Sequence, residues 1–326
     1  MALFHQEGRI DMYTNESSTI IGNPVLDKER IKTKRRSKVK KTLTALSFLA
    51  PALLLYIIFM LYPMLDAVRY SLFDWNGSST TMNFVGLENY LQLAKDDIFH
   101  KALGHNLLWV VLSLVLMVLP TLILAVLISK VKYGKTFFRA GFYLPSVLSL
   151  AVVGVLWSKI YDPAMGPINK LLSSIGLGFL AKNWLGEPAF VIPALVIAST
   201  WAFYGLYMIL FLAGLQNIDY QVYEAADLDG AGPIRKFWHI TVPSLRNTMN
   251  LVISMVIIHA LKGFALIWLM TQGGPFYMSE VVSTYVYKAA FSMNQVSYAS
   301  AGSVVLGIIV ITFTIAFNYY RERSEA

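Results

Sequence analysis

Polar side chains of two kinds lie inside long apolar stretches of this sequence, where such groups are costly unless they have a role. Lys262 lies in one stretch, with His259 three residues before it and therefore on a neighbouring position of a helix. A lysine placed there either faces a water-filled cavity, pairs with another subunit, or extends toward a polar interface. In another stretch, Tyr204 and Tyr207 share a helical face with Thr200. Such a face either packs against neighbouring helices or binds sugar, whose apolar ring faces stack on aromatic rings.

Residue patterns for catalysis are missing from this sequence. Gly134-Lys135-Thr136 has the ending of a phosphate-binding loop, but Ser129 stands where that motif requires glycine and no strand precedes it. The five histidines do not have metal-ligand spacing, no Ser/His/Asp set is indicated, and there is no cysteine. We therefore expect a protein that is not an enzyme and that does not bind ATP itself.

Composition indicates an integral membrane protein. Hydrophobic residues make up 56% of the 326 residues, and charged residues only 14%. Six apolar runs approach or exceed the roughly 20 residues that a helix needs to cross the membrane. They cover 43–65, 106–129, 139–160, 189–215, 247–270 and 298–319. The expected organisation is all-α, with a basic tail over 1–42, a six-span domain over 43–320 and a short carboxyl terminus over 321–326.

The distribution of lysine and arginine predicts the orientation of the spans. Of the 27 basic residues, 19 lie in the tail, the 130–139 loop, the loop after the fourth run and the carboxyl terminus. Seven lie in the loops of the other side. Because basic loops stay in the cytoplasm, both termini are expected there, in a multi-pass protein of the inner membrane. The basic tail is better explained as an anchor beside anionic lipid than as a nucleic-acid arm.

The polar loop between the fourth and fifth runs reads as helix, sharp turn and helix. Asp219 is a suitable N-cap for a helix over 220–228. Gly230 allows a turn with positive φ, and Pro233 suits the first turn of a second helix. Pro243 is expected to end that second helix before the next apolar run.

This loop resembles the EAA loop of ABC-importer permeases, in which EAA, three residues, G, nine residues and I-x-L-P follow one another. The matching residues are Glu224, Ala225, Ala226, Gly230, Ile240 and Pro243. Val242 departs from the pattern, since the family usually has leucine there. Further segments are similar to the sugar branch of the family, the maltose-transporter type: 84–90, 143–145, 157–169, 213–218 and 273–275. The similarity covers roughly residues 45–320.

The resemblance implies the type I importer permease fold and a set of partners. These are a second, similar permease that completes a heterodimeric pore, two cytoplasmic ATPase subunits, and an extracytoplasmic solute-binding protein. ATP and Mg²⁺ would be bound by the ATPases, so this chain itself would hold no cofactor and no metal. The EAA loop would transmit motion from the ATPases as a coupling helix. Residues expected to carry that coupling are Glu224, Ala225, Ala226, Asp229, Gly230 and Pro243.

In maltose-type subunits the sugar contacts come from the spans that flank the EAA loop. By position, the substrate-binding residues here would be Tyr204, Tyr207, His259, Lys262 and Gly263. The family often has a neutral amide where this chain has Lys262, so we expect an acidic saccharide such as an alginate-like uronate oligomer. One alternative is a non-sugar solute such as glycerol phosphate. Another is an ion-coupled secondary transporter, although the interiors of the six runs contain no Asp or Glu.

Overall fold

The computed structural model describes residues 44 and 46–323, so the predicted tail over 1–42 lies outside the described residues. The residues up to Pro63 and those from Met64 onward form two separate compact units. In the described part, helices alternate with loops, and the β-structure consists of two antiparallel strands of two residues each. Strand β1 (Phe73–Asp74) pairs with β2 (Asn83–Phe84), and Phe73 lies opposite Phe84.

Within the described residues, four helices are long and apolar enough to cross a membrane. They are Leu46–Tyr70, Asp97–Ser129, Pro188–Gln216 and Val296–Tyr319. Two bent helix pairs raise the number to six if each pair is one span. This arrangement confirms the all-α membrane class expected from the apolar runs.

Three spans agree with the sequence prediction. The second is a continuous helix made of α4 (Asp97–Ser113), η2 (Leu114–Val118) and α5 (Leu119–Ser129). The fourth is α9 (Pro188–Gln216), which passes through Pro193 without a break. The last is α16 (Val296–Arg323). Shorter elements outside the spans are α3 (Glu88–Leu93), α8 (Pro167–Ser174), η3 (Gly178–Leu180) and α15 (Val282–Phe291).

The third run is a sharply bent pair rather than one straight helix. Helices α6 (Lys135–Val147) and α7 (Leu150–Ile160) meet at an angle of 96°. Leu148 and Ser149 are both extended between them, and the Ser149 hydroxyl accepts a hydrogen bond from the Val152 N–H. A side-chain cap of this kind starts a new helix, which is why the direction changes there.

The fifth predicted span, over 247–270, is divided between two helices. Helix α13 (Arg246–Leu261) ends before Lys262, and the short α14 (Ala265–Met270) begins three residues later. At its other end, α13 meets the helix Pro233–Ser244 at 73°. That helix consists of α11 (Pro233–Lys236), η4 (Phe237–Thr241) and α12 (Val242–Ser244), so it ends at Ser244, one residue after the predicted end at Pro243.

A widened helical turn accounts for how Pro243 is accommodated. The π-helical turn η4 ends two residues before it. The same spacing separates η2 from Pro120, and η1 (Ile57–Leu61) from Pro63. A proline ring clashes with the carbonyl four residues earlier and supplies no N–H, so an α-helix must be locally altered to continue through it. In each case that carbonyl belongs to the π-helical turn, which provides the required change in geometry.

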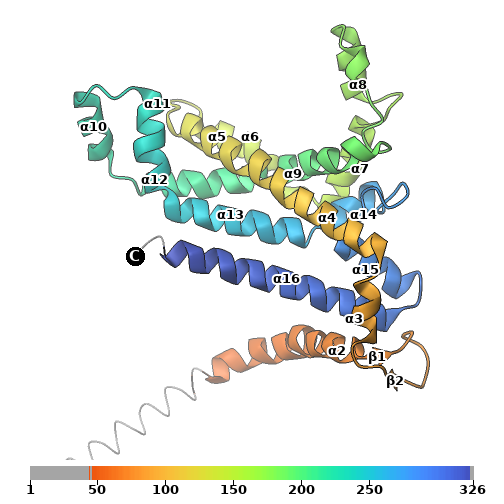
Figure 1. Cartoon of the computed structure of the whole chain (residues 1–326). Coiled ribbons are helices and arrows are strands. Elements are labelled where there is room, and N and C mark those ends of the chain that lie inside the picture. Colours follow the sequence, from red (N-terminus) through yellow and green to blue (C-terminus); the bar gives the residue numbers. More distant parts are fainter. Residues whose placement is uncertain (1–43, 45, 324–326) are drawn as a thin grey trace, which may run out of the picture. The chain divides into compact units, whose positions relative to one another are not determined.

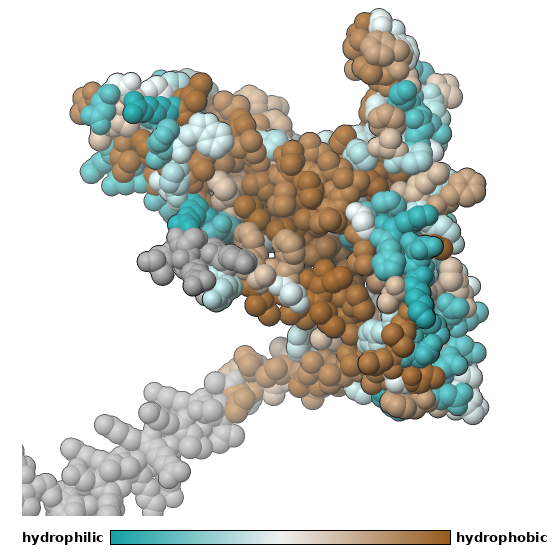
Figure 2. All heavy atoms as spheres, in the orientation of Figure 1, coloured by the Kyte–Doolittle hydropathy of each residue, from teal (hydrophilic) through white to brown (hydrophobic). Residues whose placement is uncertain are grey.

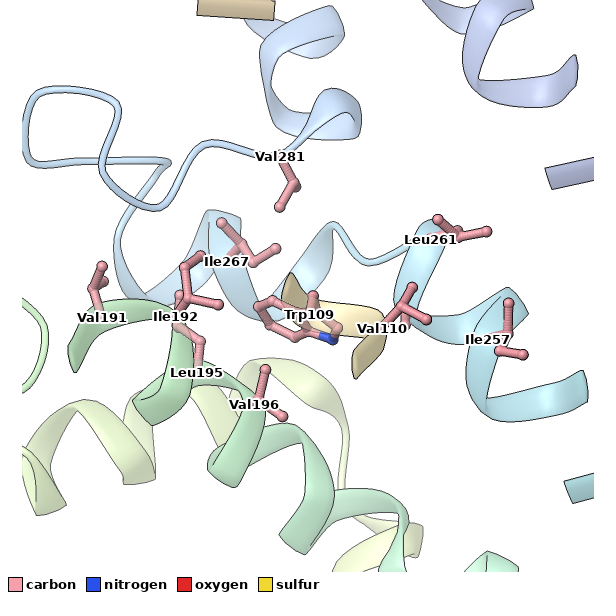
Figure 3. Close-up of a cluster of buried hydrophobic side chains, with 11 residues drawn as sticks. Trp109, Val110, Val191, Ile192, Leu195, Val196, Ile257, Leu261, Ile267 and Val281 are labelled. Carbon is pink, nitrogen blue, oxygen red and sulfur yellow. The ribbon is translucent and has the colours of Figure 1, made fainter. Parts of the chain in front are cut away.

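The core of the unit from Met64 onward is built around α9. Figure 3 shows Trp109 and Val110 of α4 between side chains of α9, such as Ile192 and Leu195, and side chains of α13 and α14. A second cluster continues along α9 with Tyr207, Met208 and Phe211, which are all fully buried. Close packing of α4, α9, α13 and α14 therefore fixes the surroundings of the α13–α14 break.

Polar and apolar surfaces are segregated along this unit. The region from α10 (Tyr220–Leu228) to α12 and the carboxyl-terminal end of α16 lie at one end, whereas α7, α8, α14 and α15 lie at the other (Figure 1). Figure 2 shows hydrophobic side chains across the middle of the visible face and hydrophilic ones toward both ends. A membrane protein requires this pattern, because its middle contacts hydrocarbon.

Gly205 of α9 permits the close approach of α6. A Cβ at this position would lie 2.3 Å from the Phe142 carbonyl oxygen and 2.5 Å from Tyr143 Cα. We predict that Gly205→Ala lowers the free energy of unfolding by about 1–3 kcal/mol or more, because the backbone of α6 must move. The midpoint of thermal unfolding of the purified protein measures this.

Gly104 of α4 provides the matched control, since a Cβ there would meet nothing within 4 Å. Gly104→Ala is expected to leave stability unchanged or to raise it by about 0.5–1 kcal/mol, because alanine favours helix more than glycine does. Equal unfolding midpoints for the two variants would contradict the packing argument.

Candidate functional site

The break between α13 and α14 is supported by side chains from two other elements. Asn106 of α4 donates from Nδ2 to the Leu261 carbonyl at 3.3 Å and accepts from the Val282 N–H at 2.9 Å. The Ser283 hydroxyl of α15 donates to the Gly263 carbonyl. An interrupted helix leaves carbonyls without partners, and such groups are costly in a membrane. These two side chains therefore make the break possible at this position.

Asp96 fixes α15 against α4 near the same end of the molecule. Hydroxyls of Tyr285 and Tyr298 both donate to its Oδ2, and its Oδ1 accepts from the Ile98 N–H at 2.8 Å. Burial opposes ionisation, but the hydrogen bonds from the two tyrosines and the backbone outweigh it and lower the pKa of Asp96. The carboxylate thus holds α15 in place, and α15 carries Ser283 to the break.

A cavity of about 360 Å³ lies beside the break. Its volume lies within the range of small-molecule sites. Helices α4, α9 and α13 each contribute part of the wall. Among the residues that line it are Trp109, Ser113, Ser199, Phe203, His259, Lys262 and Gly263. Aromatic and aliphatic surface therefore surrounds a small number of hydroxyl, imidazole and ammonium groups.

His259 is oriented by a contact behind the cavity. The Tyr207 hydroxyl lies 3.0 Å from His259 Nδ1, and the Phe203 ring centroid lies 5.1 Å from that of the imidazole. Tyr207 is fully buried. Because the Tyr207 hydroxyl is hydrogen-bonded to His259 Nδ1, Nε2 is the imidazole nitrogen that remains for a ligand.

The five predicted substrate residues have different positions relative to the cavity. His259, Lys262 and Gly263 line it together. Tyr207 contacts His259 but is not one of the lining residues. Tyr204 is half-buried on α9 and does not line the cavity in the described chain. A binding role for each of the five stays a prediction.

Sequence reasoning missed the part of the cavity that α4 provides. Ser113 Oγ is buried without a hydrogen-bond partner among the described residues, and it lines the cavity with Trp109. A signal was present, because Asn106, Trp109 and Ser113 recur at i, i+3 and i+7 in an otherwise apolar run. That spacing places them on one helical face.

The loop over 219–245 has the local structure that the sequence predicted. Helix α10 (Tyr220–Leu228) begins after Asp219, whose side chain accepts from the Gln221 N–H at 3.0 Å. Gly230 has φ of +73°, the left-handed conformation that favours glycine. In the same turn, the Ala231 N–H donates to the Ala226 carbonyl at 2.9 Å, which closes the end of the helix.

Two side-chain contacts attach α10 to the rest of the chain. The Tyr223 hydroxyl lies 2.9 Å from Thr241 Oγ1, and Asp227 forms a salt bridge with Lys236. None of the 9 residues of α10, all of which the structure describes, is buried. Leu228 is 90% exposed. Glu224 and Ala225 are also exposed. A short helix that exposes both apolar and acidic residues is suited to contact with another protein.

Comparison with known proteins identifies relatives over most of the chain. A family model described as a binding-protein-dependent transport system inner membrane component matches residues 105–325. The probable ABC transporter permease protein YurN of Bacillus subtilis (strain 168) is 38% identical over 281 residues, which cover 85% of this chain and 96% of the relative. The multiple sugar-binding transport system permease protein MsmF of Streptococcus mutans is 35% identical over 271 residues, covering 81% of this chain and 90% of the relative.

The fold is similar to that of a solved structure. It is described as the crystal structure of a bacterial ABC transporter involved in the import of the acidic polysaccharide alginate. The TM-score is 0.78 at 24% sequence identity, and the match covers 89% of this chain and 99% of that chain.

The contact between Tyr207 and His259 distinguishes the two predicted tyrosines. We predict that Tyr207→Phe raises the apparent KM for solute uptake by reconstituted protein about three- to tenfold, because one hydrogen bond is worth about 1 kcal/mol. Tyr204→Phe serves as the matched comparison and is expected to change the KM less, because Tyr204 does not line the cavity. An effect of Tyr204→Phe as large as that of Tyr207→Phe would contradict this assignment.

Proposed function

This chain belongs to the family of binding-protein-dependent transport system inner membrane components, and we propose that its cavity admits an acidic saccharide during import. As a member of this family it is the permease subunit of a sugar-type ABC importer. Such a permease is a transporter subunit of the inner membrane, with no enzymatic activity of its own, and it works with ATPase and solute-binding partners. Its energy source is therefore a partner's ATP hydrolysis rather than an ion gradient.

The observation that carries the proposed substrate class is Lys262 at the cavity. No carboxylate forms a salt bridge with Lys262 in the part of the chain that the structure describes. Lys262 is exposed at this cavity, and an ammonium group without a carboxylate partner can form a charge-assisted hydrogen bond with an anionic ligand. Trp109 and Phe203 supply aromatic surface on the same wall, which suits the apolar faces of sugar rings.

Assembly and orientation are further parts of this proposal. A second, similar permease would complete a heterodimeric pore, and the cavity would lie on the path through it. Both termini would be cytoplasmic, which is supported by the distribution of basic residues and by the shared position of α10–α12 and the end of α16 (Figure 1). ATP and Mg²⁺ would be held by the ATPase subunits.

The α10 segment is the proposed contact with those ATPases. Glu224, Ala225 and Ala226 would lie at the interface, and the turn over Asp229 and Gly230 would fix the angle at which α10 projects. Pro243 would mark the transition from the loop to α13. Closure of the ATPases would then move α10 as a rigid element and switch the access of the cavity.

Replacing Lys262 tests the substrate class. We predict that Lys262→Gln lowers uptake of a uronate oligomer by the reconstituted complex about tenfold or more, because a charge-assisted hydrogen bond contributes about 1.5–3 kcal/mol. Uptake of a neutral oligosaccharide of equal length should change little. Lys262→Arg, which keeps the charge, is expected to retain most of the uronate uptake. Unchanged uronate uptake by Lys262→Gln would exclude an acidic saccharide, and uptake of glycerol phosphate alone would favour the non-sugar alternative.

The glycines of the loop offer a matched test of coupling. Gly230 requires a left-handed conformation, whereas Gly232 has φ of −66°, and a Cβ on either residue would meet nothing within 4 Å. Gly230→Val should uncouple the complex, so that the ATPases still hydrolyse ATP while solute uptake falls at least tenfold. Gly232→Val should transport normally.

Glu224→Lys tests the same interface through charge. It is expected to insert in the membrane but to lose uptake, because the reversed charge opposes the ATPase surface that accepts a carboxylate. Membrane fractionation and uptake assays measure the two properties separately. Normal uptake by both Glu224→Lys and Gly230→Val would exclude a coupling role for α10.

A further inference from the structure

A second cavity, of about 520 Å³, lies next to α10 at the opposite end of the spans from α14 and α15. Its walls come from the end of α5, the start of α6, the end of α9 and the α10–α11 turn. Four cationic side chains line it: Lys130, Lys135, Arg139 and Lys236. The same wall carries a single carboxylate, Asp227.

The positive charge of this cavity is largely uncompensated. Asp227 forms its salt bridge with Lys236. In residues 46–323, no carboxylate forms a salt bridge with Lys130, Lys135 or Arg139. Three cationic groups therefore face the cavity without an opposite charge, and a bound anion would relieve their mutual repulsion.

Two of these cations are held in position rather than extended into solvent. Lys135 Nζ donates to the Ser129 carbonyl at 3.1 Å, which holds the side chain across the turn between α5 and α6. Arg139 lies one helical turn further along α6, and its Nε is buried with no hydrogen-bond partner among the described residues. A buried guanidinium N–H without an acceptor is costly, and a phosphate oxygen could satisfy it.

The surroundings place the cavity at the level of lipid headgroups. Part of its wall is apolar, with Leu212 and Leu215 of α9 and Phe237 of η4. On the flanking segments, Tyr133 is 89% exposed and Trp238 is 52% exposed. Exposed aromatic side chains beside lysine and arginine are typical of the boundary between hydrocarbon and water.

We propose that this cavity binds the phosphate headgroup of an anionic phospholipid. Arg139 and Lys135 contact the phosphate, Lys130 adds charge at the exposed edge, and the acyl chains run along the apolar wall into the membrane. A basic pocket between spans provides both the charge and the depth that a lipid headgroup requires. The site rests on the membrane nature of the family and not on which solute the protein carries.

A soluble anion or an acidic protein surface fits the cavity less well. Free phosphate would not use the apolar wall, and an acidic side chain of another protein would not use it either. Because Asp227 and Lys236 belong to the same wall, a bound headgroup would also stabilise the attachment of α10. We therefore expect the lipid to support the geometry of the coupling loop.

The first experiment measures lipid retained by the assembled complex. Complexes in nanodiscs of phosphatidylglycerol and phosphatidylcholine are extracted in detergent, and bound lipid is counted by native mass spectrometry. The double variant Arg139→Gln/Lys135→Gln is expected to retain phosphatidylglycerol about tenfold more weakly than the unaltered complex. Arg139→Lys should retain it at an intermediate level. Lys132→Gln is the matched control, since Lys132 is exposed in the same loop but does not line the cavity.

The second experiment uses the unaltered complex, so it does not depend on how a variant folds. Hydrogen exchange of residues 130–140 is followed after adding phosphatidylglycerol, phosphatidylcholine or inorganic phosphate. Protection by phosphatidylglycerol alone supports the proposal. Protection by inorganic phosphate that phosphatidylglycerol does not match would overturn it in favour of a soluble anion.

Two further results would also overturn the proposal. One is equal retention of phosphatidylglycerol by the double variant and the Lys132→Gln control. The other is loss of the ATPase subunits from the double variant with no change in bound lipid, which would assign these cations to a protein interface.

Discussion

The need to satisfy every backbone carbonyl in a membrane is the constraint on which this structure depends. Helix α13 stops at Leu261, and the carbonyls at the break accept hydrogen bonds from Asn106 and Ser283 instead of from N–H groups of a next helical turn. Because those side chains come from α4 and α15, the break exists only when the helices are assembled. The cavity beside Lys262 is therefore a property of tertiary packing and not of α13 alone.

Prolines alter the helices of this protein in more than one way. Each π-helical turn described above ends two residues before a proline. The second span continues past Pro120 to Ser129, whereas the helix that contains Pro243 ends at Ser244 and α13 begins at an angle of 73° to it. Pro145 and the Ser149 cap instead accompany a bend of 96° between α6 and α7. Proline alone therefore does not decide whether a helix bends, and in the third span the Ser149 cap starts the new helix.

Local features were predictable from the sequence, and long-range ones were not. Asp219, Gly230 and Pro233 each determine the conformation of their own neighbours, so the helix-turn-helix loop was correctly predicted. The spacing of His259 and Lys262 also predicted that they would share a site region. The end of α13 was not predictable, because the carbonyl partners of Leu261 and Gly263 lie 155 and 20 residues away in the sequence. The contribution of Ser113 and Trp109 depends in the same way on how α4 packs against α9.

Helix α13 is a single stiff element that connects the loop over 219–245 to the cavity beside Lys262. Its 16 residues extend over about 24 Å at 1.5 Å per residue. One end follows the loop that carries α10, and the other end is Leu261, next to Lys262 at the cavity. A helix resists compression along its axis, so the distance between the two ends of α13 is nearly constant. An axial displacement of α13 would therefore also move Leu261 beside the cavity, and the break after Leu261 separates this movement from α14.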